Sequence, residues 1–96
     1  MIKIVAKMVV KEDKVEDFVK AAEELVAKSA AEEGNASYSL NRHLERANEF
    51  TFIEFWKDDA ALQSHNASAH FTTILPLLAE MTAEAPEINL YSEVTW

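Results

Sequence analysis

The 96-residue chain is 49% hydrophobic and carries 17 acidic against 9 basic side chains, a formal charge of −8 and no cysteine. This length and composition predict one domain over residues 1–96. The absence of cysteine excludes disulfides, thiolate metal sites and cysteine nucleophiles. It is also typical of a cytoplasmic protein. The negative charge argues against nucleic acid and anionic membrane partners, and no apolar run is long enough to span a membrane.

The first third of the chain is predicted to form a strand followed by a helix. Apolar side chains stand at every second position from Ile2 to Val10, which is the period of a strand. Asp13 is expected to cap the helix, with Glu16 as its capping-box partner, and Gly34 to end it as a left-handed residue. Three- and four-residue intervals mark the buried stripe of this helix: Val15, Phe18, Val19, Ala22, Leu25, Val26 and Ser29.

Two strands joined by a turn are predicted next, at Ser37–His43 and Glu49–Trp56. The second is the more hydrophobic, and apolar residues stand on both of its faces: Phe50, Phe52 and Trp56 on one, Ile53 and Phe55 on the other. A single layer of helices covers only one face of a sheet. The other face is therefore expected to pack against a second copy of the chain, as a homodimer.

A broken helix and a last strand complete the pattern. Asp58 or Asp59 is expected to cap a short helix, and Ser68 to cap a second one in which Pro76 marks a kink or a restart. Glu87–Thr95 alternates as the final strand. The order strand, helix, strand, strand, helix, strand predicts an α+β chain of ferredoxin-like βαββαβ topology, a four-stranded antiparallel sheet with helices on one face.

Candidate functional residues gather between Glu54 and Phe71. Glu54 interrupts an apolar strand face, where a carboxylate is costly unless it is paired. It is therefore a pocket acid or base with a raised pKa, an acceptor that orients His65, or a buried structural acceptor for the amides at a helix end. His65 and His70 can exchange protons near pH 7. Each alone is typical of a helix surface, whereas together with Glu54 and Trp56 they favour the lining of a pocket for a small-molecule substrate.

Other site chemistries have weaker support. Arg42 could hold an anionic or carbonyl oxygen, although a surface position is the more common interpretation of such an arginine. His65 and His70, five positions apart, could bind a metal with Glu54 as the third ligand, but a metal-free pocket is favoured. A single glycine cannot form a phosphate loop or a dinucleotide fingerprint, and no Gly-x-Ser-x-Gly elbow is present.

The middle of the chain carries a family resemblance. The motif comprises Phe52–Leu62, His65, Ser68, His70 and Phe71, and it resembles the antibiotic biosynthesis monooxygenase (ABM) domain family. Lys11–Phe18 and Glu32–Asn35 also match that family's first helix and its end, so the likeness covers nearly the whole chain. It implies a dimeric α+β barrel and, for part of the family, oxidation of quinol-like or phenolic compounds by dioxygen without metal or flavin.

The resemblance also implies roles for individual residues. It places the site in a cavity between sheet and helices, with His65 as the proton-transfer group. The predicted catalytic residues are His65 and Glu54. The predicted substrate contacts are Trp56, His70, Phe71, Phe52 and Arg42.

Two further functions stay open. Another branch of the family isomerises a small phosphorylated dicarbonyl, which would need basic residues, and only Arg42, Arg46 and Lys57 lie near. The chain could also be a dimeric small-molecule-binding protein without catalysis. A haem-degrading branch carries an asparagine on the first strand, where this chain has Lys7, so haem chemistry is not favoured.

Overall fold

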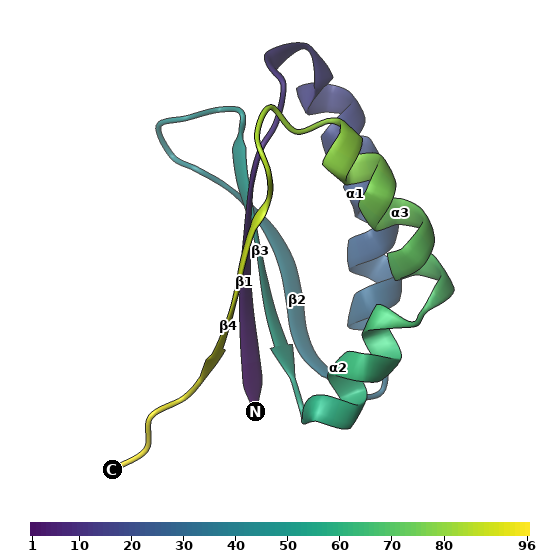
Figure 1. Cartoon of the computed structure of the whole chain (residues 1–96), viewed down its shortest axis with the longest axis vertical. Coiled ribbons are helices and arrows are strands. Elements are labelled where there is room, and N and C mark those ends of the chain that lie inside the picture. The colour runs from purple at the N-terminus through teal and green to yellow at the C-terminus, as the bar shows by residue number, and fades with distance from the viewer.

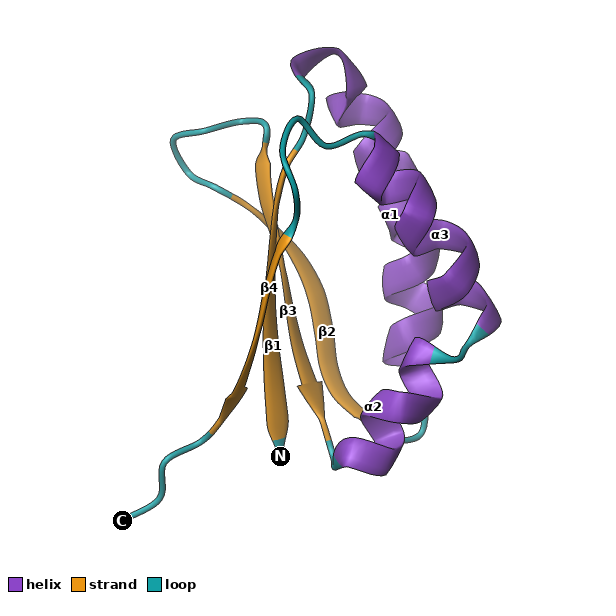
Figure 2. Cartoon of the chain, viewed as in Figure 1, coloured by secondary structure: helices purple, strands orange, loops and turns teal.

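An antiparallel sheet carries all of the helices on one of its faces (Figures 1 and 2). The computed structural model describes residues 1–96. Its elements are β1 (Ile2–Val9), a 3-10 helix (Glu12–Lys14), α1 (Val15–Ala30), β2 (Asn35–Arg42), β3 (Glu49–Trp56), α2 (Asp59–Asn66), α3 (Ala69–Glu80) and β4 (Glu87–Ser92). The strand order β2-β3-β1-β4, with every pairing antiparallel, confirms the predicted ferredoxin-like topology.

Local capping explains where the second and third helices begin. Asp58 accepts a hydrogen bond from the backbone N–H of Ala61 at 2.8 Å, and Ser68 accepts one from the N–H of Phe71 at 3.3 Å. Each cap satisfies an amide that the first turn of a helix leaves free. Both predicted caps are confirmed, with Asp58 rather than Asp59 at the start of α2. No restart occurs at Pro76, because α3 runs unbroken through it.

Two predictions about the ends of α1 are wrong. Asp13 lies in the 3-10 helix, and α1 starts at Val15 without a side-chain cap, so no capping box forms with Glu16. Gly34 does not have a positive φ. A Cβ atom at Gly34 would lie 2.3 Å from the Cβ of Ala61, so glycine is needed there because α2 passes very close to the start of β2.

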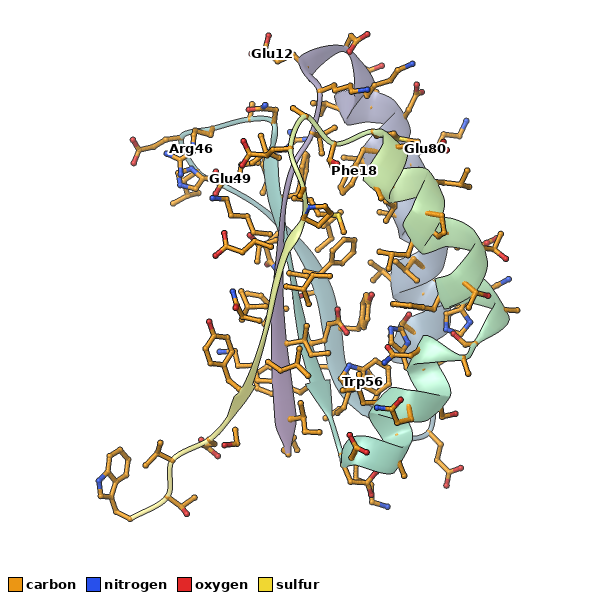
Figure 3. The ribbon with its side chains drawn as sticks, in the orientation of Figure 1. Glu12, Phe18, Arg46, Glu49, Trp56 and Glu80 are labelled. Carbon is orange, nitrogen blue, oxygen red and sulfur yellow. The ribbon has the colours of Figure 1, made fainter.

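The hydrophobic core fills the space between the sheet and the helices. Phe18 of α1 and Trp56 of β3 both point into this layer in Figure 3, and both are fully buried. The opposite face of the sheet is covered by nothing in the single chain, and Ile53 and Phe55 lie on it only partly buried. The homodimer therefore stays a prediction. None of the helices combines the length and the hydrophobicity required to cross a membrane.

Candidate functional site

A cavity of about 360 Å³ lies between the sheet and the helices. All four strands and all three α-helices contribute to its wall, and 11 of its 14 lining residues are hydrophobic. Its polar side chains are Glu54, His65 and Asn66, together with the hydroxyl-bearing Tyr38, and no lysine or arginine lines it. The cavity therefore suits a small, mostly apolar ligand that makes a few directed hydrogen bonds.

Glu54 lies buried on the sheet side of the cavity, because it follows the inward-facing residues of β3 at a spacing of two. Its Oε1 accepts a hydrogen bond from the Trp56 indole Nε1–H at 2.9 Å. Burial raises the pKa of Glu54 to about 7, although its interactions with Trp56 and Tyr38 act in the opposite direction. Tyr38 is the cross-strand partner of Glu54, and its own burial raises the pKa of its hydroxyl above the ordinary value. Tyr38 consequently stays protonated at neutral pH.

His65 faces Glu54 from the last turn of α2. Its side chain is only 1% exposed, with the Trp56 ring centroid at 4.3 Å and the Phe71 ring centroid at 4.9 Å. Nδ1 lies 2.6 Å from Oε2 of Glu32. Nε2 has no hydrogen-bond partner and lies 4.0 Å from Oε1 of Glu54.

The surroundings of His65 determine which nitrogen carries its proton. Burial lowers the pKa of His65, while the hydrogen bond to Glu32 acts in the opposite direction. A neutral imidazole has one donor and one acceptor nitrogen. Because the Glu32 carboxylate accepts a hydrogen bond, Nδ1 is the donor. Nε2 is then an unpaired acceptor in a buried position, which is the arrangement that a general base requires.

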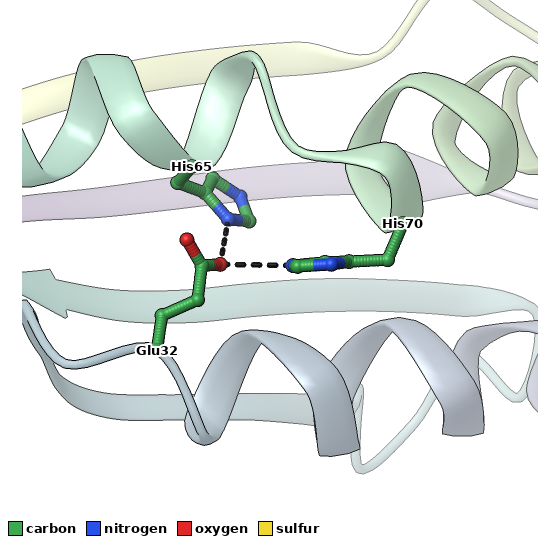
Figure 4. A group of neighbouring side chains, drawn as sticks. All are labelled: Glu32, His65 and His70. Atoms are coloured by element: carbon green, nitrogen blue, oxygen red, sulfur yellow. Dashed lines mark hydrogen bonds and ion pairs between the residues drawn. The ribbon is translucent and has the colours of Figure 1, made fainter.

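Glu32 is the site residue that sequence reasoning missed. It lies between α1 and β2, and its Oε2 also accepts a hydrogen bond from Nε2 of His70 at 2.9 Å (Figure 4). From the sequence, Glu54 was the carboxylate considered as a third metal ligand beside the two histidines. The structure instead places Glu32 between them, and Glu54 is beyond hydrogen-bond distance of His65. Nothing in the local sequence distinguishes Glu32 from its neighbour Glu33.

The structure brings together most, but not all, of the predicted site residues. Those on the cavity wall are Glu54, His65, Phe52 and Phe71. Trp56 packs behind the wall against the His65 ring, and His70 lies on the far side of Glu32. Arg42 lies at the other end of the sheet, with its guanidinium 4.9 Å from the Phe50 ring centroid. Arg42 is not among the residues that line the cavity.

Comparison with known proteins relates the chain to one protein family. Residues 1–76 match the family described as "Antibiotic biosynthesis monooxygenase". The Bacillus subtilis (strain 168) protein named "Putative monooxygenase YcnE" is 46% identical over 71 residues, which are 74% of this chain and 75% of that protein. A conserved protein from Methanosarcina mazei Go1 has a TM-score of 0.94 at 38% identity, covering 97% of this chain and 92% of its own. A crystal structure described as an antibiotic biosynthesis monooxygenase has a TM-score of 0.94 at 30% identity, covering 99% of this chain and 100% of that chain.

Proposed function

Because the chain belongs to the antibiotic biosynthesis monooxygenase family, we propose that it is a monooxygenase that oxidises a small quinol-like or phenolic compound with dioxygen. One observation carries this proposal. His65 lines the wall of an apolar cavity, where its Nε2 has no hydrogen-bond partner and its Nδ1 is hydrogen-bonded to Glu32. A buried base next to an apolar binding space suits the removal of a proton from a phenolic hydroxyl.

The cavity supports an aromatic substrate of modest size. Its volume of about 360 Å³ is near the lower end of the range for small-molecule sites, which begins at roughly 300 Å³. Tyr38, Phe52 and Phe71 supply aromatic surfaces against which a planar ring can pack. The substrate hydroxyl would be directed toward the polar groups His65 and Glu54.

The proposed reaction begins with proton transfer from the substrate hydroxyl to Nε2 of His65. The Glu32 carboxylate stabilises the imidazolium that forms, because it already accepts the Nδ1–H bond at 2.6 Å. The resulting phenolate is rich in electrons and can pass an electron to dioxygen itself. Exclusion of water by the apolar wall protects the reactive intermediates that follow.

The atoms of the proposed reaction balance without a further reductant. A hydroquinone and one dioxygen give a hydroxyquinone and one water. One oxygen atom forms a carbon–oxygen bond to the ring, and the other leaves as water after the oxygen–oxygen bond breaks. The substrate supplies both electron pairs and the two hydrogens of the water, and His65 carries one of those protons between the two partners.

Isotope labelling with ¹⁸O₂ tests this function on a panel of quinols and phenols. The wild type is expected to consume oxygen above the autoxidation blank and to place one ¹⁸O atom in the product. His65→Gln should lower the rate by about 10²–10⁴-fold, because an amide cannot act as the base. His43→Gln is the matched control, since His43 lies in the β2–β3 connection and hydrogen-bonds the backbone amides of Glu45 and Arg46.

Three outcomes would contradict parts of the proposal. No oxygen uptake by the wild type with any compound would defeat the monooxygenase function and favour a non-catalytic binding protein. Unlabelled quinone formed together with hydrogen peroxide would show an oxidase instead. An unchanged rate in His65→Gln would refute the role of His65. The phosphorylated-carbonyl isomerase has no comparable support, because the cavity wall carries no cation for a phosphate.

We also propose that the chain acts as a homodimer in which the exposed sheet face is buried. Val5, Ile53 and Phe55 lie side by side on that face, where Ile53 pairs with Val5 across the β1–β3 ladder, and no helix covers them. Burial of such apolar area stabilises a small domain by about 25 cal/mol per Å². Sedimentation equilibrium should give twice the mass of the chain, and a monomeric mass at micromolar concentration would refute the dimer.

A further inference from the structure

Glu32, His65 and His70 come from three different segments of the chain and meet beside the cavity (Figure 4). One nitrogen of each histidine and one oxygen of Glu32 lie within 4.8 Å of one another, and Oε2 of Glu32 contacts Nδ1 of His65 and Nε2 of His70. Each atom has a lone pair once the two histidines give up the protons that they donate to Glu32. Two imidazoles and one carboxylate form a ligand set that binds zinc and other divalent transition metals.

The distances within this cluster are close to those of an occupied site. Zinc binds histidine nitrogen and carboxylate oxygen at roughly 2.0–2.2 Å, so neighbouring ligand atoms of a tetrahedral site are about 3.3 Å apart. Oε2 of Glu32 lies 2.6 Å from the His65 nitrogen and 2.9 Å from the His70 nitrogen. These two pairs would each need to separate by only about 0.4–0.7 Å to admit an ion, which side-chain rotation can supply.

The unpaired nitrogen of His65 can take up the proton that a metal ion on the other ring nitrogen would displace. While Nδ1 donates to Glu32, the buried Nε2 has no partner. A metal ion on Nδ1 would move the proton to Nε2, which lies 4.0 Å from the Glu54 carboxyl. Histidines that bind metals usually donate their other N–H to a carboxylate in this manner. Metal binding would therefore change Nε2 from a buried acceptor into an N–H donor, and a movement of about 1 Å would bring the Glu54 carboxyl, its nearest acceptor, within hydrogen-bond distance.

An ion could reach the cluster from solvent. The side chains of Glu32 and His70 are 17% and 14% exposed, so water can supply the remaining ligands. Glu32 also lines a surface hollow of about 390 Å³ together with Glu33 and Asp58, and the one cation there is Lys57. The acidic surface of this hollow and the net charge of −8 both attract cations.

We propose that Glu32, His65 and His70 form a binding site for a divalent transition-metal ion of the zinc type, completed by water. The site itself does not depend on the proposed function. One consequence does rest on that function: an ion on Nδ1 would leave the proton on Nε2, so the metal-bound chain would lack the base and zinc would inhibit oxygenation.

Titration of the chelator-treated protein with Zn²⁺, followed by calorimetry, tests the site. One equivalent per chain is expected for the wild type. His70→Ala and Glu32→Gln should each weaken binding by at least about tenfold, whereas His43→Ala and Glu33→Gln should bind as the wild type does. Equal affinity in all five proteins, or no binding by the wild type, would overturn the proposal.

A second measurement avoids any variant that fails to fold. Long-range ¹H–¹⁵N spectra of the wild type resolve the histidine ring nitrogens with and without Zn²⁺. Nδ1 of His65 and Nε2 of His70 should both shift, and Nε2 of His65 should change from an unprotonated to a protonated nitrogen. Shifts confined to His43 would show adventitious binding and overturn the site. Both readouts are independent of oxygen uptake, so loss of the proposed function leaves them intact.

Discussion

Replacement of Glu54 by glutamine measures how much unfolding free energy this fold loses by burying a carboxylate. Glu54 is 6% exposed, and its Oε1 accepts the Trp56 indole N–H. The Oε1 of a glutamine can accept the same hydrogen bond, and the two side chains have nearly the same shape. The substitution therefore removes the titratable charge and leaves the packing in place.

The direction of the pH effect follows from the folded and unfolded pKa values. Burial raises the pKa of Glu54 from 4.5 to about 7, so in this interval the folded chain keeps a proton that the unfolded chain has released. Stability from the neutral carboxyl is fully present below pH 4.5 and is lost as the pH rises through about 7. A pKa difference of this size corresponds to roughly 3 kcal/mol of unfolding free energy.

Urea unfolding at pH 5 and pH 8 measures this change. Between these values the wild type should lose about 2–3 kcal/mol more unfolding free energy than Glu54→Gln, because groups that titrate alike in both proteins cancel. Glu33→Gln removes a carboxylate from an exposed position and should follow the wild type. Parallel pH profiles for wild type and Glu54→Gln would refute the reasoning that burial penalises the Glu54 charge.

Three further substitutions test individual contacts by urea unfolding. Gly34→Ala should lower the unfolding free energy by about 1–3 kcal/mol, because the new methyl group overpacks against Ala61. Adding Ala61→Gly should restore most of that free energy. An unchanged unfolding free energy in Gly34→Ala would contradict the close approach of the two residues. Ser68→Ala should lower the unfolding free energy by about 1 kcal/mol by removing the cap of α3, and an unfolding free energy equal to that of the wild type would contradict this. Trp56→Phe should lower the unfolding free energy more at pH 8 than at pH 5, because it removes the hydrogen bond to Glu54. A hydrogen bond to a charged carboxylate contributes about 1.5–3 kcal/mol, and one to a neutral group about 0.5–1.5 kcal/mol. A loss of unfolding free energy that does not depend on pH would contradict the role of the indole N–H.

Local sequence patterns were sufficient for most of the fold. The bounds of β3 were predicted correctly because two-residue periodicity continues without a break from Glu49 to Trp56. Asp58 and Ser68 were recognised as caps because a capping side chain contacts an amide only three residues away. Gly34 was identified as special for the wrong reason, because its constraint comes from Ala61, which is distant in the sequence.

The candidate site shows the same division between local and distant information. Glu54 and His65 were noticed because each is out of place in its own segment, a carboxylate on an apolar strand face and a histidine near the end of a short helix. Glu32 was missed because it stands beside Glu33 on a polar stretch, and its histidine partners lie 33 and 38 residues further along the chain. These residues come together only because α2 and α3 fold beside the connection between α1 and β2.

The cavity wall holds two groups that are each unfavourable without a ligand. Nε2 of His65 is a buried acceptor without a donor, and Glu54 is a buried carboxyl with a raised pKa, and the two lie 4.0 Å apart. A buried polar atom without a partner costs about 1–3 kcal/mol. A substrate hydroxyl between them could donate to Nε2 and accept from the protonated carboxyl of Glu54, and it would satisfy both groups at once. A ligand with an aromatic ring and one such hydroxyl should therefore bind far better than the same ring without it, because the hydrocarbon would leave Nε2 of His65 without a donor.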